Sequence, residues 1–123
     1  MLPEKLTEVL KNESVVAIVT EGIEGVHVVN TWNSYIKITA DERILIPVGG
    51  MNATETNIKQ NSKVLMTLGS REVQGFHSKG TGFLISGIGA FVYDGADFNE
   101  IKKRFPWIRA VLKIEARYIT QTL

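Results

Sequence analysis

Short apolar runs separated by brief turn segments dominate the sequence, and their spacing restricts its fold more than any other feature. The runs are rich in β-branched residues or alternate apolar with polar residues, as β-strands do. The predicted strands cover residues 14–20, 26–32, 35–39, 43–48, 63–68, 82–93 and 109–118. Segments of three to five residues join the first two pairs of runs, and such short connections predict antiparallel hairpins. We therefore expect six or seven strands.

Three short helices are predicted between these strands, at residues 3–11, 52–60 and 97–104. Residues 70–80 are predicted to form a polar, glycine-containing loop with at most a little strand in it, and Gly87 with Gly89 predicts a bulge or bend in the surrounding strand. Alternation in the last strand places Ala110 and Tyr118 on one face. Because antiparallel hairpins leave exposed edges unless the sheet closes, we expect a closed or partly closed barrel.

Length, net charge and cysteine content exclude several classes of protein. The 123 residues fit one domain, 1–123, and their net charge of +1 argues against a nucleic-acid-binding role. A chain of this length buries only about two-thirds of its unfolded surface, so formation of a homodimer would help it. There is no cysteine, which excludes disulfides, thiolate nucleophiles and sulfur-ligated metal sites. No segment has the pattern of a signal peptide or a membrane span, so we expect a cytoplasmic protein without membrane contact.

Two segments carry candidate site residues. The first interleaves two large aromatics with four short polar side chains: Asn30, Thr31, Trp32, Asn33, Ser34 and Tyr35. The polar groups can hydrogen bond to the heteroatoms of a planar ring while the aromatics cover its faces. Packing of both aromatics in the core or in a dimer interface explains the stretch equally well, so this segment alone leaves the two interpretations open.

The second segment joins a predicted strand to a predicted helix and contains Gly49, Gly50, Met51, Asn52, Ala53 and Thr54. Glycines allow a ligand to approach the backbone, and the first amides of a helix attract anions. A capped turn without a ligand has similar residues, so this segment alone is weak evidence for a phosphate site. Together the two segments describe a planar polar ring with a phosphate tail, which are the parts of flavin mononucleotide (FMN).

Other motifs add no catalytic or metal site. The pairs Gly80 with Gly82 and Gly87 with Gly89 lack the third glycine of a dinucleotide fingerprint, and neither pair opens a predicted helix. The two histidines have no metal-ligand spacing, so no metal site is predicted. The spacing of the residues also identifies no catalytic acid, base or nucleophile.

At these residues the sequence resembles the small FMN-binding proteins of sulfate-reducing bacteria, within the flavin split-barrel, or pyridoxamine-phosphate-oxidase-like, superfamily. The resemblance rests on the blocks EVLKNE, HVVNTWNSY, PVGGM, VLMTLGSR, GTGFLI and QTL, which span residues 8–123. It implies a mainly β fold, namely a six-stranded antiparallel split β-barrel with short helices. It also implies a homodimer with one FMN per subunit.

The resemblance implies roles for individual residues. The stretch 30–35 would line the isoalloxazine ring and the ribityl chain, and Gly49, Gly50, Met51 and Thr54 would hold the ribityl-phosphate end. Trp107 matches a second aromatic near the ring, while Asn12 and Glu13 match residues close to the site. Thr122 and Leu123 match a terminus that reaches the flavin of the partner subunit.

The sequence departs from this family pattern in two places. Ala53 stands where a lysine is expected beside the phosphate, and Arg71 is a weak candidate for the replacing cation. The stretch 105–107 carries a one-residue insertion, which affects the pose of Trp107.

The leading hypothesis is a non-covalent FMN flavoprotein that transfers electrons to or from a redox partner protein such as a cytochrome. The alternative is an FMN-dependent oxidoreductase of the flavin-reductase or pyridoxamine-phosphate-oxidase type, which needs a substrate pocket that the sequence does not specify. A flavin-free interaction module is a third hypothesis, and the matched blocks disfavour it. The sequence leaves open whether the chain is an enzyme.

Overall fold

The computed structural model describes residues 2–123, which form seven strands, three α-helices and one 3₁₀ turn. The elements in chain order are α1 Glu4–Leu10, β1 Val15–Gly22, β2 Gly25–Trp32, η1 Asn33–Tyr35, β3 Lys37–Ile38, β4 Ile44–Val48, α2 Asn52–Gln60, β5 Lys63–Gln74, β6 Lys79–Val92, α3 Gly95–Arg104 and β7 Ala110–Gln121. None of the helices within residues 2–123 is long and apolar enough to cross a membrane.

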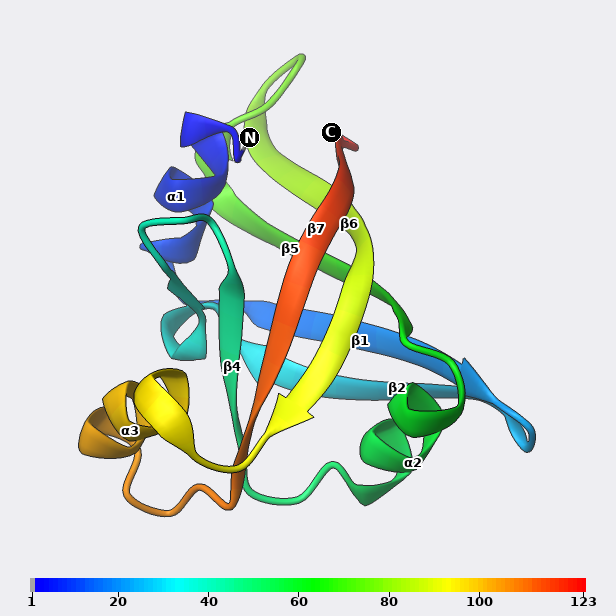
Figure 1. The fold of residues 1–123 in the computed structure, drawn as a ribbon. Helices are drawn as coiled ribbons and strands as arrows, with labels where there is room; N and C mark the ends of the chain where they lie inside the picture. The colour runs from blue at the N-terminus through cyan, green and yellow to red at the C-terminus, as the bar shows by residue number, and fades with distance from the viewer. Residues whose placement is uncertain (1) are drawn as a thin grey trace.

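All strands belong to one antiparallel sheet with the order β2-β1-β5-β6-β7-β4-β3. Figure 1 shows that the sheet curls strongly, so that β1 and β2 run across the direction of β4 and β7. The mainly β prediction is confirmed. The count of six strands that the resemblance implies is wrong, because the two-residue β3 adds an edge beside β4, while the count of six or seven from the sequence pattern includes the observed seven. Within the described residues no pairing joins the two edges β2 and β3, so the strand order is that of an open sheet.

The prediction of a polar loop at residues 70–80 is largely wrong. β5 continues to Gln74, and β6 already begins at Lys79. Between the pairs Ser70–Thr81 and Gln74–Lys79, β5 advances by four residues and β6 by two. The ladder therefore continues past an irregularity, and exposed polar side chains on both strands hid it from the sequence pattern.

The predicted bulge near Gly87 is confirmed by a register shift between Ser86 and Gly87 in the β6–β7 pairing. The shift reverses the alternation of side chains in β7. Ala110 is buried, whereas Tyr118 is 75% exposed, so these two residues do not share a face as the sequence predicted.

Apolar side chains form two cores. The larger lies inside the curled sheet, where Leu6 and Val9 of α1 and Ile58 of α2 join residues of the strands. The smaller consists of Leu45, Ile101, Phe105, Ile108 and Val111, and it holds α3 against β4 and β7. Each fully buried aliphatic or aromatic side chain stabilises the fold by about 1.5–3 kcal/mol. The smaller core fixes residues 105–109 beside the end of β4, where the candidate site begins.

Candidate functional site

The loop between β4 and α2 lies beside the start of β7 and is held there by Arg109. The backbone N–H of Arg109 donates to Val48 O at 2.9 Å. Its guanidinium donates from Nε to Gly49 O at 3.1 Å, and from Nη2 to Gly50 O at 2.6 Å and to Asn52 Oδ1 at 3.2 Å. A planar guanidinium suits several fixed acceptors at once. Arg109 thus clamps the loop in one conformation.

The charge of Arg109 is matched by Glu55 in the first turn of α2. Nη2 of Arg109 lies 2.9 Å from Glu55 Oε1, and the hydroxyl of Tyr93 donates to the other carboxylate oxygen. The hydrogen bond from Arg109 and then that from Tyr93 lower the pKa of Glu55 below its ordinary value. Arg109 and Glu55 therefore form an ion pair whose net charge at the loop is close to zero.

The N-terminus of α2 has unsatisfied polar groups. Met51 precedes the helix in the left-handed conformation, with φ 56° and ψ 39°, and no side chain caps the first turn. Thr54 in that turn is fully buried, and its Oγ1 has no hydrogen-bond partner within residues 2–123. Such a buried hydroxyl costs about 1–3 kcal/mol. An anion seated on the first turn would satisfy helix amides and the Thr54 hydroxyl together.

A cavity of about 340 Å³ opens beside this helix terminus. Asn52 and Ala53 line it from α2, and His27 lines it from β2. The cavity leaves space for a polar group at the first turn of the helix.

Three aromatic rings cluster on the other side of the loop. The ring centroids of Tyr35 and Phe105 are 4.9 Å apart, and that of Trp107 lies 6.0 Å from Tyr35 and 5.7 Å from Phe105. A Cβ on Gly49 would lie 3.2 Å from the Trp107 ring, so glycine lets this ring approach the backbone closely. Phe105 is buried, but Trp107 is 52% exposed and offers an aromatic surface to solvent.

The first predicted segment is divided between the two faces of β2. Thr31 and Asn33 are buried, whereas Asn30 and Trp32 are exposed on the outer face. Among the described rings, Trp32 does not contact the cluster of Tyr35, Phe105 and Trp107. The strand period of two explains the division, because successive side chains point to opposite faces.

Asn33 joins three parts of the fold. Its Nδ2 donates to Val9 O at 3.2 Å, Asn12 O at 2.7 Å and Gly69 O at 3.1 Å. Its Oδ1 is buried and has no partner in the described chain. Asn33 therefore has a structural role through its nitrogen, while its oxygen is a free acceptor.

Glu13 fixes the turn that follows Asn33. Its Oε1 accepts from Ser34 N at 3.0 Å, and its Oε2 accepts from the Ser34 hydroxyl. These two hydrogen bonds lower the pKa of Glu13. The side chain of Asn12 bonds to Glu8 O at 3.0 Å at the end of α1, so Asn12, Asn33 and Ser34 lie together.

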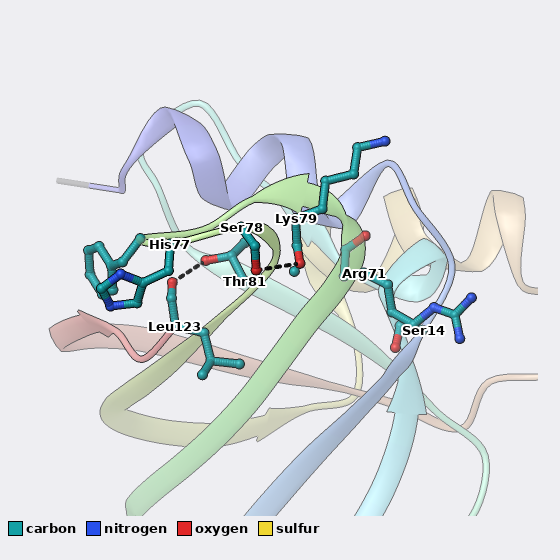
Figure 2. Close-up of a pocket in the computed structure, with 10 residues that line it drawn as sticks. Ser14, Arg71, His77, Ser78, Lys79, Thr81 and Leu123 are labelled. Atoms are coloured by element: carbon teal, nitrogen blue, oxygen red, sulfur yellow. Dashed lines mark hydrogen bonds between the residues drawn. The ribbon is translucent and has the colours of Figure 1, made fainter.

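Thr122 and Leu123 contact the β5–β6 hairpin. Thr122 N donates to Gly82 O at 2.8 Å, and Leu123 O accepts from Thr81 Oγ1 at 2.8 Å. Arg71 and Leu123 line a pocket beside this hairpin, which Figure 2 shows. The structure thus places Arg71 at the hairpin, and the cation on the Gly49 loop is Arg109.

The structure brings the predicted residues together in part. Tyr35, Gly49 and Trp107 are in contact, and Gly50, Met51 and Thr54 follow along the same loop. A second group contains Asn12, Asn33 and Ser34, a third contains Thr122 and Leu123, and Asn30 and Trp32 face outward. In the described part of the chain, no three His, Asp or Glu side chains are grouped as metal ligands would be.

Sequence reasoning missed Arg109, Glu55 and Phe105. Arg109 reaches the loop only because β4 pairs with β7 in the register that places Val48 opposite Ala110. No local pattern specifies that register. The available signal was an arginine two residues after Trp107, at the start of the last predicted alternating run.

No family model matches the sequence. The chain is 55% identical over 123 residues to a protein named FMN-binding protein from Nitratidesulfovibrio vulgaris (strain DSM 19637 / Miyazaki F), and the match covers 100% of both chains.

Solved structures with low sequence identity share the fold. HupZ of Group A Streptococcus has a TM-score of 0.81 at 17% identity, covering 98% of this chain and 94% of HupZ. An FMN-binding protein from Syntrophomonas wolfei has a TM-score of 0.74 at 18% identity, covering 98% and 85%. A protein described as a putative pyridoxamine 5'-phosphate oxidase from Lactobacillus delbrueckii has a TM-score of 0.75 at 15% identity, covering 97% and 93%. The fold is therefore that of pyridoxamine 5'-phosphate oxidase-like proteins, and the identity to the Nitratidesulfovibrio protein shows that this chain belongs to the FMN-binding protein family.

Proposed function

We propose that the chain binds FMN non-covalently and acts as a redox carrier. The observation that carries the proposal is the geometry of the loop 49–54. An uncapped helix terminus with an unpartnered buried hydroxyl at Thr54 lies on one side, and an exposed aromatic ring packed on Gly49 lies on the other. The relative with 55% identity is named for FMN binding, which supports the same ligand.

The phosphate end of FMN fits the first turn of α2. Amides of that turn and Thr54 Oγ1 supply donors, and a helix N-terminus carries about half a positive charge. Ala53 supplies no cation, and the charge of Arg109 is shared with Glu55. The phosphate is therefore bound by the dipole of α2 and by hydrogen bonds more than by a positively charged side chain such as lysine. His27 lies across the adjacent cavity.

The ring of FMN fits the aromatic cluster. Trp107 and Tyr35 supply apolar planes, and Asn33, whose buried Oδ1 has no partner within residues 2–123, stays a candidate for the edge of the ring. Asn12, Asn30, Thr31, Trp32 and Ser34 stay candidates for the edges of the ring and the ribityl chain. In this proposal Thr122 and Leu123 shield the flavin of a second subunit.

The outer face of β1 and β2 supports a homodimer. Val15 and Trp32 lie opposite each other and are each 45% exposed, and Val26 and Val28 on the same face are 64% and 57% exposed. Exposed apolar side chains grouped on one face of a sheet are typical of an interface. A second copy on this face would bury Trp32. A cytoplasmic location and a redox partner such as a cytochrome stay predictions.

Bound FMN supplies one- and two-electron redox chemistry. The chain's own residues bind and orient the cofactor and exclude water from it. His77 lies on the β5–β6 hairpin, and His27 lies on β2 across the cavity beside α2. The side chain of neither histidine makes a hydrogen bond within residues 2–123. This arrangement favours a carrier, because the carboxylate of Glu55 beside the loop is held by Arg109 and Tyr93.

The cofactor of the purified protein tests the proposal. We expect a yellow protein that releases one FMN per chain on denaturation and is reduced only slowly by NADH or NADPH. Release of FAD, or absence of any flavin after incubation with FMN, would refute FMN binding. Rapid catalytic reduction by NADH or NADPH would instead support the oxidoreductase alternative.

A further inference from the structure

The last turn of α3 carries three consecutive cations, Lys102, Lys103 and Arg104. All three residues are exposed, and the exposed Trp107 follows shortly after them in the chain. The C-terminus of a helix carries only about half a negative charge, which one cation balances. Three cations in one turn therefore leave excess positive charge at this end of α3.

Two of these cations are held against the segment that contains Trp107. Lys102 Nζ donates to the backbone oxygen of Ile108 at 3.1 Å. The guanidinium carbon of Arg104 lies 4.8 Å from the centroid of the Phe105 ring. That centroid is in turn 5.7 Å from the centroid of the Trp107 ring. The contacts of the two cations therefore lie on either side of Trp107 in the chain and keep both charges near its ring.

Carboxylates near the last turn of α3 offset only part of its charge. Glu100 Oε2 lies 3.8 Å from Lys103 Nζ, and both side chains are largely exposed to water. Hydrogen bonds from Ser34 and, more weakly, the charge of Arg104 lower the pKa of Glu13. Glu100 and Glu13 are thus the two carboxylates that face these cations.

Other charges around the aromatic cluster do not reverse this balance. Arg43 pairs with Asp97 of α3, and the ion pair at the loop 49–54 has a net charge close to zero. Lys37 on the edge strand β3 is a further exposed cation, and it lines the same groove as Arg104. Cations therefore outnumber carboxylates around the cluster and create a positive potential there.

The surface formed by Lys102, Lys103, Arg104 and Trp107 has the composition of a protein interface, and we call it the basic face. Tryptophan and arginine are enriched among the residues that contribute most to binding energy. The basic face belongs to α3 and the segment after it, which pack against β4 and β7. It is therefore separate from the outer face of β1 and β2, where a second copy of the chain is proposed to bind.

We propose that the basic face is the docking site for a redox protein whose own docking surface is acidic. This inference rests on the proposed function, because Trp107 belongs to the aromatic cluster at which the ring of FMN is proposed to bind. Cations on the basic face attract the carboxylates of the partner and speed its approach at low ionic strength. A partner docked on this face is brought to the end of the molecule where electrons are exchanged.

Quenching of Trp107 fluorescence in the apoprotein tests the charge of the basic face without FMN. Trp32→Phe serves as the background, because it leaves Trp107 as the single tryptophan of the chain. We expect quenching by iodide to weaken as ionic strength rises, and quenching by uncharged acrylamide to stay constant. Lys103→Gln and Arg104→Gln should each lower the iodide quenching constant about 1.5- to 2-fold at low salt, as loss of one nearby charge in water does. Neither substitution should change the acrylamide constant.

Lys79→Gln is the matched control for these two substitutions. Lys79 is an exposed lysine at the start of β6, in the hairpin that Figure 1 shows far from α3. Its replacement removes the same charge from the chain and should leave both quenching constants unchanged.

Oxidation of the reduced, FMN-loaded protein tests whether the same charge acts on electron exchange. We expect the rate constant with anionic ferricyanide to fall as ionic strength rises, and that with cationic hexaammineruthenium(III) to increase. Hexaglutamate models an acidic docking surface and should slow the reaction with ferricyanide, whereas hexalysine should not. Lys103→Gln and Arg104→Gln should reduce the effect of hexaglutamate, and Lys79→Gln should not.

Iodide quenching that is independent of ionic strength and equal in all the variants would overturn the proposal. So would a Trp107 that acrylamide does not quench, because the basic face would then be covered in the isolated protein. Hexaglutamate and hexalysine with equal effects on the ferricyanide reaction would also overturn it. A protein that binds no FMN would instead refute the proposed function, while the quenching of the apoprotein would still decide whether the face is positive.

Discussion

Replacement of Thr54 by valine tests whether the Thr54 hydroxyl binds the ligand or stabilises the fold. Thr54 is fully buried in the first turn of α2, and its Oγ1 has no partner within residues 2–123. Valine has nearly the same shape, and the two residues have similar helix propensities. Thr54→Val therefore changes the polarity of the site and little else.

We expect Thr54→Val to stabilise the protein without FMN but to weaken the binding of FMN. Without ligand, the substitution removes an unpaired buried hydroxyl, so we expect the free energy of unfolding to rise by about 1–2 kcal/mol. A gain of that size raises Tm by about 3–8 °C for a domain of this length. With FMN, the substitution removes a hydrogen bond to a charged phosphate, worth about 1.5–3 kcal/mol. The Kd for FMN should therefore increase about 10- to 150-fold.

Thermal unfolding of the apoprotein and calorimetric titration with FMN measure the two effects. Thr7→Val is the control, because the Thr7 hydroxyl is exposed and bonds to Glu4 O within its own helix at 2.6 Å. This control should change stability by no more than about 0.5 kcal/mol and FMN affinity not at all. A destabilised Thr54→Val apoprotein with unchanged FMN affinity would show that Thr54 fills a structural role and does not face the phosphate.

Three further substitutions test other parts of the account. Arg109→Ala removes the donors to Gly49 O and Gly50 O, and it should lower the free energy of unfolding by about 1–3 kcal/mol in denaturant titrations. It should also flatten the loss of stability at acid pH, because the lowered pKa of Glu55 adds stability above the ordinary carboxyl pKa that disappears as pH falls. Val28→Glu places a charge on the outer face of β2 and should shift the protein from dimer to monomer in sedimentation velocity. Ala53→Lys should tighten FMN binding by about 0–1 kcal/mol in titrations at low salt, and less at high salt because of screening.

A different outcome would contradict each of these three predictions. Arg117→Ala is the control for Arg109→Ala, since Arg117 is exposed and lies 3.7 Å from Glu115; equal stabilities of the two variants would mean that no clamp exists. A Val28→Glu protein that sediments like the wild type would place any dimer interface elsewhere. Weaker FMN binding by Ala53→Lys at low salt would show that position 53 does not face the phosphate.

The hairpins and helices could be predicted because their signals are local. The β1–β2 pairing, from Val15 with Trp32 to Gly22 with Gly25, follows from two apolar runs and a short glycine turn. The extension of β5 and β6 past Ser70 was hidden, since exposed strand residues there are polar and the register is irregular. The outward position of Tyr118 follows from a bulge whose effect on β7 depends on pairing with β6.

The part of the candidate site that is built from one continuous segment could be predicted from the sequence. The loop 49–54 has the predicted strand before it and the predicted helix after it. The contacts of Arg109 with Gly49 and Gly50 join residues about sixty positions apart, so only the sheet register reveals them. The structural use of Asn33 was equally hidden, because its three acceptors come from α1, the residues after α1 and β5.

Titration of the apoprotein with FMN and with riboflavin tests the central claim most directly, because the two ligands differ only in the phosphate. The account predicts that one FMN binds per chain and that its Kd is at least about tenfold lower than that of riboflavin, since the phosphate gains a charge-assisted hydrogen bond from Thr54 and the dipole of α2. Equal affinities for FMN and riboflavin would contradict a phosphate site at the loop 49–54. Absence of binding by either ligand would contradict flavin binding itself.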